Sequence, residues 1–348
     1  MNSIIKDDIT KIIESFSGWE RFNGKTVLIS GANGFLPAYL VETLIGLNSY
    51  LKNINVNVIA LVRNKEKAAK RFAHLLPNKY LTILIKDVCD EIIIEKKIDF
   101  IIHAASQASP KYYGIDPVGT LSANVIGTIN MAKLAVTHKV DSFLYFSSGE
   151  VYGELSEKEM PVSENTFGYL NPAKVRSCYA ESKRMGETIC VSWMHQYGVK
   201  AKIVRPFHTY GPGMQLDDGR VFADFVSNIV SKKNIVLNSD GSAQRAFCYL
   251  SDATIAFFTV LLNGKDGEAY NVGNPDQEYS ILELANLVLD LKPELNLKLV
   301  INTPAINETY LKSPVSRNTP NINKLMLLGW RPKVTAKVGF ERTINSFN

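Results

Sequence analysis

Tyr179 and Lys183, four residues apart, carry the clearest chemical signal in the sequence. Residues with this spacing share one face of a helix, so the lysine ammonium can lie near the phenol. A neighbouring cation lowers the pKa of a phenol from about 10, which makes the tyrosine a usable general base. Ser148 can hydrogen-bond the same substrate hydroxyl, and Glu150 can act as a second acid–base group. Taken singly, each of these residues is also consistent with a structural role.

A glycine-containing turn supplies the second signal. The apolar stretch 26–30 is followed directly by GANGFLP, residues 31–37. Gly31 permits a tight turn, and Gly34 lets backbone amides approach a pyrophosphate at the start of a helix. Pro37 stands where a third glycine is usual, and proline is tolerated in a first helical turn. The turn predicts a dinucleotide site formed by Gly31, Asn33, Gly34, Phe35 and Leu36.

The identity of the dinucleotide depends on the end of the second apolar stretch. An acidic residue there holds the ribose hydroxyls of NAD, but this chain has Arg63. Arg63 either pairs with the 2′-phosphate of NADP or is simply solvated, so these residues leave NAD and NADP both open. Asp87 and Val88, after the third stretch, are candidates for the adenine site, although a surface turn would have the same appearance.

Short apolar runs alternate with helical patterns through the first half of the chain. The runs indicate strands at 26–30, 57–62, 81–85, 100–104, 142–148 and 202–207. Helices are expected at 118–138 and 179–197. Near-continuous apolar runs separated by helices are typical of a doubly wound parallel sheet of the Rossmann type. In such an α/β fold ligands bind at the carboxyl ends of the strands, where these motifs converge.

The pattern becomes less regular after Pro206, which indicates a second, smaller lobe. We expect an N-terminal helix and a dinucleotide-binding domain over residues 1–205, with a return segment at about 246–272. Residues 206–348 are then expected to form the substrate-binding lobe.

Composition excludes several classes of protein. Hydrophobic residues make up 46% and charged residues 21%, which argues against disorder. The net charge of +5 is too small and dispersed to indicate nucleic acid, although it suits a small anionic ligand. No apolar run is long enough to span a bilayer, and apolar positions in the first 16 residues indicate an amphipathic helix packed on the body. The four cysteines show no CxxC spacing, so neither a metal site nor disulfides are expected and a cytoplasmic location fits.

Several longer stretches together give the sequence a family resemblance. They are HAASQASPKYY (103–113), DPVGTLSANVIGTINMAKLA (116–135), SSGEVYG (147–153), NPAKVRSCYAESKRMGET (171–188), RPFHTYGPGMQLDDGRVFADFV (205–226), GSAQRAFCYLSDA (241–253), YNVGNP (270–275) and LGWRPK (328–333). The chain from about residue 24 resembles the extended short-chain dehydrogenases/reductases that act as nucleotide-sugar epimerases, dehydratases and decarboxylases. The resemblance is greatest to the branch that decarboxylates UDP-glucuronate. It implies NAD as cofactor, a nucleotide sugar as substrate, and a homodimer formed through helices such as 118–138 and 179–197.

The resemblance also implies roles for individual residues. Tyr179 and Lys183 match the base and its partner, Ser148 the third member, and Glu150 a carboxylate near C5. Further cofactor contacts are implied for Ala104, Ala105 and Pro206. Substrate contacts are implied for Ser106, Tyr113, His208, Arg220, Val221, Arg245 and Arg317, and guanidinium groups suit phosphates because they bind them bidentately.

Three departures bear on the reaction. Gly149 lies where dehydratases have an aspartate and decarboxylases usually a serine, His208 replaces an asparagine, and Ala180–Ser182 replace Asp–Glu–Gly. The expected reaction starts with oxidation at C4 of the sugar. Decarboxylation is the expected next step, with 4,6-dehydration and 4-epimerisation as alternatives. A catalytically inactive dinucleotide sensor is a further alternative, which the retained Tyr179, Lys183 and Ser148 disfavour.

Overall fold

The structure, a computed structural model, describes residues 1–302 and 316–347. A seven-stranded parallel sheet has the order β10-β6-β5-β4-β1-β2-β3. Its strands are β1 (Thr26–Ser30), β2 (Asn57–Val62), β3 (Leu81–Ile85), β4 (Phe100–His103), β5 (Ser142–Phe146), β6 (Ala201–Pro206) and β10 (Ala269–Val272). The predicted Rossmann-type sheet is therefore confirmed. The strand order reverses between β1 and β4, which is where such sheets bind ligands.

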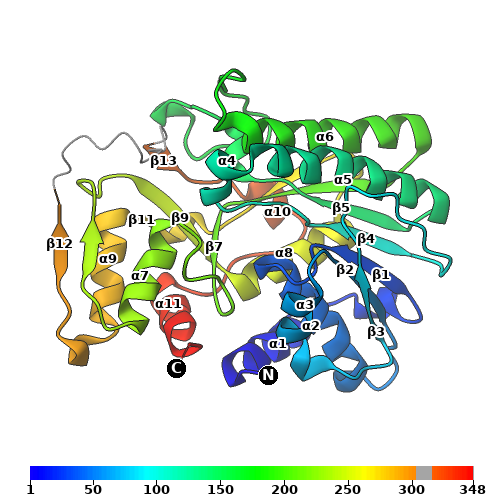
Figure 1. The fold of residues 1–348 in the computed structure, drawn as a ribbon, viewed down its shortest axis with the longest axis horizontal. Coiled ribbons are helices and arrows are strands. Elements are labelled where there is room, and N and C mark those ends of the chain that lie inside the picture. Colours follow the sequence, from blue (N-terminus) through cyan, green and yellow to red (C-terminus); the bar gives the residue numbers. More distant parts are fainter. Residues whose placement is uncertain (303–315, 348) are drawn as a thin grey trace.

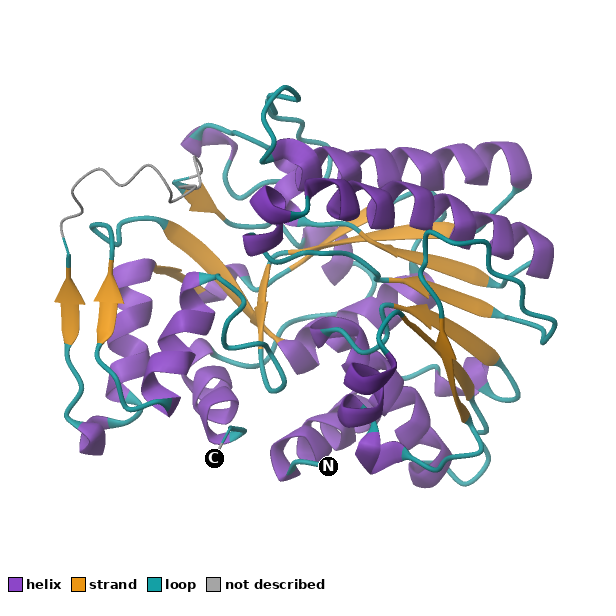
Figure 2. Ribbon diagram, viewed as in Figure 1, coloured by secondary structure: helices purple, strands orange, loops and turns teal. Residues whose placement is uncertain are grey.

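Helices cover both faces of this sheet (Figures 1 and 2). One face carries α1 (Ser3–Ser15), α2 (Phe35–Tyr50), α3 (Lys65–Arg71) and α8 (Leu250–Asn263), and the other carries α5 (Pro117–His138) and α6 (Ser177–Tyr197). Because side chains alternate along a strand, Val27 and Ile29 pack toward the first layer and Leu28 toward the second. Both faces of the sheet are thus buried under helices, as the unbroken apolar runs predict.

The N-terminal helix α1 packs on α2 and α8 through a buried stripe, as its apolar spacing predicts. The same face buries the carboxylate of Asp8. It accepts hydrogen bonds from the hydroxyls of Tyr39 on α2 (3.1 Å) and Tyr249 (2.7 Å), and from Arg342 (2.6 Å). Burial raises the pKa of Asp8 despite the arginine. Exposed Asp7 contacts Arg342 from outside at 2.7 Å.

The smaller lobe is built on β9 (Gln244–Tyr249), which pairs with β7 (His208–Tyr210), β11 (Glu278–Ser280) and β13 (Arg317–Asn318). Around it lie α7 (Val221–Val230), α9 (Ile281–Asp290), α11 (Ala336–Asn345) and the strand pair β8 (Ile235–Leu237) and β12 (Leu299–Ile301). The remaining described α-helices are the short α4 (Lys111–Ile115) and α10 (Asn323–Met326). The return to the first sheet is made by α8 and β10, starting at Leu250. Residues 246–249 of the expected return segment instead belong to β9, because that strand pairs within the lobe.

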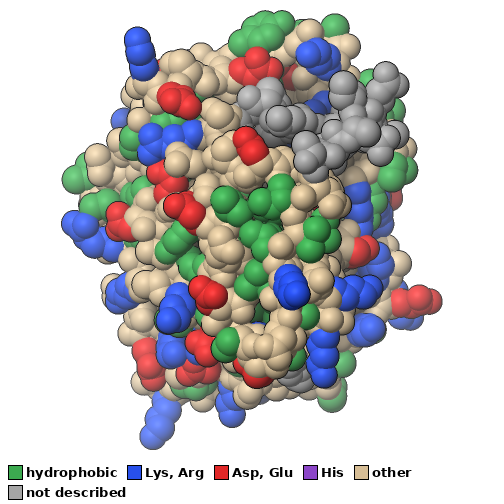
Figure 3. Space-filling model, turned by 90° about the vertical axis from the view of Figure 1, so that its left-hand side faces the viewer, with side chains coloured by type: hydrophobic (Ala, Val, Ile, Leu, Met, Phe, Trp, Pro, Cys, Tyr) green, Lys and Arg blue, Asp and Glu red, His purple; other side chains and the backbone are tan. Residues whose placement is uncertain are grey.

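Hydrophobic side chains gather near the centre of the lobe face that Figure 3 shows, the end that carries β8 and β12. Exposed residues of these two strands include Val236, Val300 and Ile301. In the described part of the chain no helix is long and apolar enough to cross a membrane. The same residues contain no cluster of side chains that could hold a metal ion, and all four cysteines are thiols.

Candidate active site

The turn between β1 and α2 brings two backbone segments unusually close. Gly31 has a φ of +65°, and a Cβ there would lie 2.7 Å from the Cα of Ala105. Gly34 precedes α2, and within the described residues no side chain caps this helix. The first amides, at Phe35 and Leu36, therefore have no side-chain acceptor. Asn33 lies in the same turn. A turn with glycine at both ends that leads into an uncapped helix N-terminus fits the diphosphate of a dinucleotide.

A chain of hydrogen bonds fixes the strand end opposite this turn. Thr128 donates to a backbone carbonyl at 2.5 Å, so its oxygen accepts from Nε2 of His103 at 3.1 Å. Nδ1 of His103 then accepts from the Ser30 hydroxyl at 2.7 Å. The Ser30 oxygen accepts from the amides of Ala104 and Ala105 at 3.2 and 3.3 Å. The chain needs a neutral imidazole, and burial lowers the pKa of His103 to about 3.

The residues predicted for the adenosine end lie at the ends of β2 and β3. Arg63 is exposed and its Nη1 lies 3.7 Å from Oδ2 of Asp87. Val88 is buried, with its side chain against Gly127 of α5. Because Asp87 already provides a negative charge beside Arg63, an additional 2′-phosphate gains less from this arginine.

The predicted catalytic residues come together at the carboxyl ends of β5 and β6. Tyr179 and Lys183 lie on α6, and Ser148 begins the short turn Gly149–Tyr152 that follows β5. Nζ of Lys183 donates to the Phe146 carbonyl at 2.6 Å and lies 5.8 Å from the centre of the Tyr179 ring. Pro206, a predicted cofactor contact, ends β6.

Burial sets the protonation of this group. It raises the pKa of Tyr179 to about 12, while a hydrogen bond with Ser148 acts in the opposite direction. It also lowers the pKa of Lys183 to about 7, against the attraction of Glu187. The tyrosine is therefore a neutral phenol in this state. An added positive charge near the phenol would favour its ionised form.

Glu150 faces the same space from the turn after β5. Its carboxylate lies 3.4 Å from Nη1 of Arg176, three residues before Tyr179, and remains partly exposed. The Arg176 guanidinium also lies 6.0 Å from the centre of the Tyr113 ring. Arg176 is absent from the predicted site, although its place one helical turn before Tyr179 could have indicated it.

Tyr113 and Arg220 border Tyr179. The ring of Tyr113 stacks on Tyr179 with centroids 5.0 Å apart and an interplanar angle of 16°. Arg220 pairs with Asp218, lies just before α7, which starts at Val221, and lowers the pKa of Tyr179 by its charge. The segment before α7 therefore approaches Tyr179.

Two predicted substrate contacts contain buried polar atoms with no hydrogen-bond partner in the described part of the chain. They are Nδ1 of His208 and Oγ of Ser106. His208 lies between the rings of Phe222 and Phe247, and its burial lowers its pKa well below the ordinary value, with Arg245 and Arg220 adding to the effect. His208 is thus a neutral imidazole beside two guanidinium groups.

The sheet register separates the other two predicted arginines. Arg245 pairs with Asn318 and Tyr279, whereas Arg317 pairs with the neighbouring residue Gln244. Since successive side chains alternate between faces, Arg245 and Arg317 lie on opposite faces of the lobe sheet. His208 pairs with Phe247 and shares the face of Arg245. Arg317 instead forms a bidentate pair with Glu278 at 2.5 and 2.7 Å.

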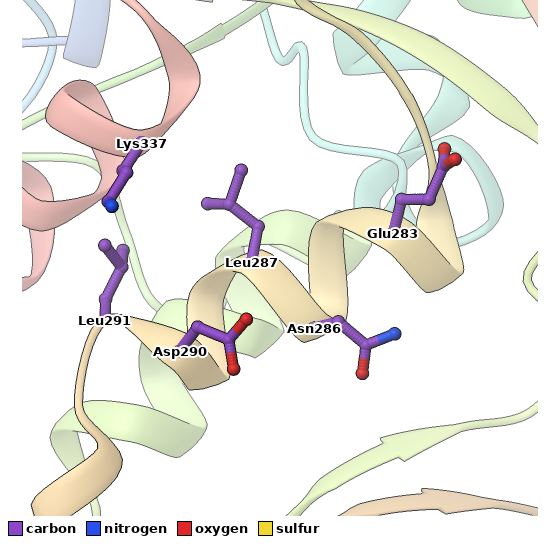
Figure 4. Close-up of a pocket in the computed structure, with 6 residues that line it drawn as sticks. All are labelled: Glu283, Asn286, Leu287, Asp290, Leu291 and Lys337. Carbon is purple, nitrogen blue, oxygen red and sulfur yellow. The ribbon is translucent and has the colours of Figure 1, made fainter.

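A groove of about 400 Å³ lies elsewhere, between α9 and α11 (Figure 4). Its lining includes Leu287, Leu291, Asp290 and Lys337, and none of the predicted site residues belongs to the described lining. It is therefore separate from the Tyr179 site.

Fold and site together define an enzyme-like dinucleotide-binding protein with a tyrosine–lysine–serine group at the same edge of the parallel sheet as the glycine turn. The chain belongs to the NAD dependent epimerase/dehydratase family, whose model matches residues 27–273. The matched region contains the glycine turn, both segments of the catalytic group and β9.

A curated relative and two solved structures show what the chain is similar to. UDP-glucuronic acid decarboxylase 3 of Arabidopsis thaliana is 36% identical over 316 residues, which cover 90% of this chain and 86% of the relative. The UDP-glucose 4-epimerase of Thermotoga maritima, solved with UDP-glucose, is 22% identical with a TM-score of 0.79 and coverage of 92% and 98%. The UDP-glucuronic acid 4-epimerase of Bacillus cereus, solved with UDP-glucuronic acid and NAD, is 21% identical with a TM-score of 0.75 and the same coverage. At these identities the two structures support the fold.

Proposed function

We propose that this protein is an NAD-dependent enzyme that decarboxylates UDP-glucuronate through a transient 4-keto sugar. The observation that carries the proposal is the convergence of Tyr179, Lys183, Ser148 and Glu150 at the sheet edge that also carries the glycine turn, in a chain 36% identical to a UDP-glucuronic acid decarboxylase. NAD, when bound, would supply reversible hydride transfer at C4 of the sugar. The turn at Gly31 and Gly34 and the first amides of α2 are the groups that would hold its diphosphate.

The chain's own residues move the protons and bind the substrate. Tyr179 takes the proton of the C4 hydroxyl, and Ser148 donates a hydrogen bond to the same oxygen. The ammonium of Lys183 stabilises the phenolate, so that a phenol whose pKa burial raises to about 12 can ionise. After decarboxylation Tyr179 returns its proton to the C4 oxygen.

Loss of carbon dioxide needs no strong acid at C5. In the 4-keto sugar the C5 carboxylate is β to the ketone, so the C5–C6 electron pair passes into an enolate as carbon dioxide leaves. A proton must then be delivered to C5, and Glu150 or water beside it is the proposed donor. Arg176, 3.4 Å from Glu150, would hold the departing carboxylate or orient the glutamate.

Binding of the nucleotide diphosphate falls to the lobe. Arg245, His208 and Arg220 are the proposed contacts, because two guanidinium groups and a neutral imidazole with an unpartnered nitrogen share one region. Ser106, Tyr113 and Val221 are proposed to line the sugar and nucleoside. Arg317 keeps its proposed diphosphate role only if the substrate displaces Glu278.

Gly149 bears on the alternatives. A 4,6-dehydratase needs an acid to protonate the leaving hydroxyl, and glycine provides none, which disfavours dehydration. A 4-epimerase needs no such acid, so 4-epimerisation is the second candidate.

The test is release of carbon dioxide from UDP-glucuronate by the purified protein with NAD, with products followed by mass spectrometry. We expect a UDP-pentose and one equivalent of carbon dioxide. Conversion of UDP-glucuronate into an isomer of equal mass would favour the epimerase. No turnover of any nucleotide sugar, with unchanged behaviour of Tyr179→Phe, would favour a sensor.

We further propose a cytoplasmic homodimer that pairs through α5 and α6. The outward faces of these helices expose the apolar residues Val118, Leu121, Ile126, Met185 and Val191. Large apolar side chains gathered on a helix pair are typical of an interface. Val118→Asp with Met185→Asp is expected to give a monomer in sedimentation velocity, and an unchanged sedimentation coefficient would contradict this pairing.

A further inference from the structure

We propose that Glu187 is a positioning residue of this site: its carboxylate anchors the loop that carries Ser148 and provides the negative charge opposite Lys183. The inference rests on the proposed function, since it assigns Glu187 a part in the Tyr179–Lys183 chemistry.

The anchoring contact joins α6 to the end of β5. The hydroxyl of Ser147 donates to Oε1 of Glu187 at 2.5 Å. Arg205 on β6 donates to both carboxylate oxygens, from Nε at 2.9 Å and from Nη2 at 2.6 Å. The side chains of Glu187 and Arg205 are only 14% and 6% exposed. Ser147 directly precedes Ser148, so the position of the catalytic hydroxyl depends on this contact.

Glu187 is one of three successive contacts from α6 to the same loop. Lys183 donates to the Phe146 carbonyl at 2.6 Å, and Nε of Arg184 donates to the Val151 carbonyl at 2.7 Å. Glu187 holds Ser147, between these two points. About one turn of the helix that bears Tyr179, from Lys183 to Glu187, therefore fixes the loop that bears Ser148, and the two catalytic groups are aligned by one helix.

Glu187 also faces Lys183 electrostatically. The residues are four apart on α6, so their side chains lie on one face. Glu187 raises the pKa of Lys183, against a burial effect that lowers it to about 7. The other titratable groups around Lys183 are buried in their neutral forms: His103, Tyr145, Tyr179 and Cys190. Arg205 approaches Glu187 from β6 and partly offsets its charge.

A purely structural ion pair with Arg205 would account for the bidentate contact alone. It would leave the titration of Lys183 unchanged when the charge is removed and the hydrogen bonds are kept. The two roles are therefore separable by experiment.

The decisive variant is Glu187→Gln, which keeps an oxygen acceptor and the side-chain shape but removes the charge. The titration of Lys183 can be followed by NMR in protein with ¹³C-labelled lysine side chains, without NAD or substrate, and assigned with Lys183→Met. We expect the Lys183 midpoint to fall by about one unit, since a nearby opposite charge shifts a pKa by about 1–3 units. An unchanged midpoint in folded Glu187→Gln would overturn the electrostatic role.

Two control variants leave the carboxylate in place. Ser147→Ala removes the anchored hydroxyl, and Tyr152→Phe removes a hydroxyl that accepts from Arg205 at 2.9 Å. Both should keep the wild-type midpoint. Ser147→Ala should lower kcat about tenfold and Tyr152→Phe less than twofold, and equal kcat losses would overturn the anchoring role. If Glu187→Gln does not fold, Glu187→Asp replaces it, because its carboxylate lies one methylene further from Lys183. We expect this variant to lower the Lys183 midpoint by a smaller amount, and no shift would count against the proposal.

Activity provides the second readout. In Glu187→Gln the alkaline limb of the kcat–pH profile should move to lower pH, because Lys183 loses its proton earlier. A wild-type protein that turned over no nucleotide sugar would contradict the proposed function and leave the NMR titration fully interpretable. The two failures are thus distinguishable.

Discussion

Replacing Gly31 with alanine tests the close approach of the glycine turn to the end of β4. The new Cβ would lie 2.7 Å from Cα and 2.9 Å from N of Ala105, and 3.1 Å from O of Ala104. These are backbone atoms, and the amides of both alanines are hydrogen-bonded to Ser30. The backbone at Ala104 and Ala105 therefore cannot move away without breaking the hydrogen bonds that connect it, through Ser30, to His103.

The expected loss of folding stability has two parts. Alanine at a φ of +65° costs about 1–2 kcal/mol, and overpacking against backbone costs about 1–3 kcal/mol more. For 348 residues the entropy of unfolding is about 0.7 kcal/mol/K, so Gly31→Ala should lower Tm by about 3–7 °C. The displaced turn should also weaken NAD binding at least about tenfold, or about 1.4 kcal/mol.

Gly24→Ala is the matched control. Gly24 also has a positive φ, +74°, but a Cβ there would meet nothing within 4 Å. It should lower Tm by about 1–3 °C and leave NAD affinity unchanged, as measured by calorimetry and thermal unfolding with and without NAD. Equal Tm losses and equal NAD affinities in the two variants would refute the argument from close approach.

Further outcomes follow from other contacts. Tyr179→Phe should lower kcat by about 10²-fold or more with Tm within 1 °C of wild type, and retained turnover would exclude it as the base. Arg245→Ala should raise KM for the nucleotide sugar about 10–100-fold, whereas Arg317→Ala, on the other face, should change KM less than threefold. Arg317 lowers the pKa of Glu278, so this pair stabilises the fold above the ordinary carboxyl pKa and the stabilisation is lost as pH falls. Urea midpoints of wild type and Arg317→Ala should therefore differ at pH 7 and converge only as the pH falls below about 4.5, through the lowered pKa of Glu278. Gly149→Ser places a hydroxyl beside the substrate carboxylate and should raise the decarboxylation rate about fivefold. Its Cβ would lie 3.2 Å from the ring of Phe207, and a slower variant would show that this contact outweighs the new hydrogen bond.

The main sheet was predictable because both of its faces are buried. Unbroken apolar runs such as 26–30 and 57–62 coincide with β1 and β2 residue for residue. The ends of β4 and β5 were predicted one and two residues too long, because the final residues turn away from the ladder to form the site. The four catalytic candidates could be found because Ser148 and Glu150 directly follow a strand, while Tyr179 and Lys183 have the spacing of one helix face.

Residues that act through long-range pairing left no local pattern. The opposite faces of Arg245 and Arg317 depend on which residues of β9 and β13 pair, and the sequence does not specify that register. Glu187 meets Arg205 and Ser147 only because β5, β6 and α6 pack together. Asp8 is charged yet buried, an arrangement that its hydrophilic surroundings in the sequence do not indicate.

The N- and C-terminal helices meet in space, and Nδ2 of Asn2 donates to the Ser346 carbonyl at 3.1 Å (Figure 1). Two positions so far apart in sequence and so close in space are suited to circular permutation. A short linker between α11 and α1 would keep the Asp8–Arg342 contact, and new ends could be opened at the exposed turn after α6, at Gly198. In such a permutant the proposed catalytic residues would still lie in one continuous segment of the chain. The site would therefore form although the sequence starts and ends at different residues.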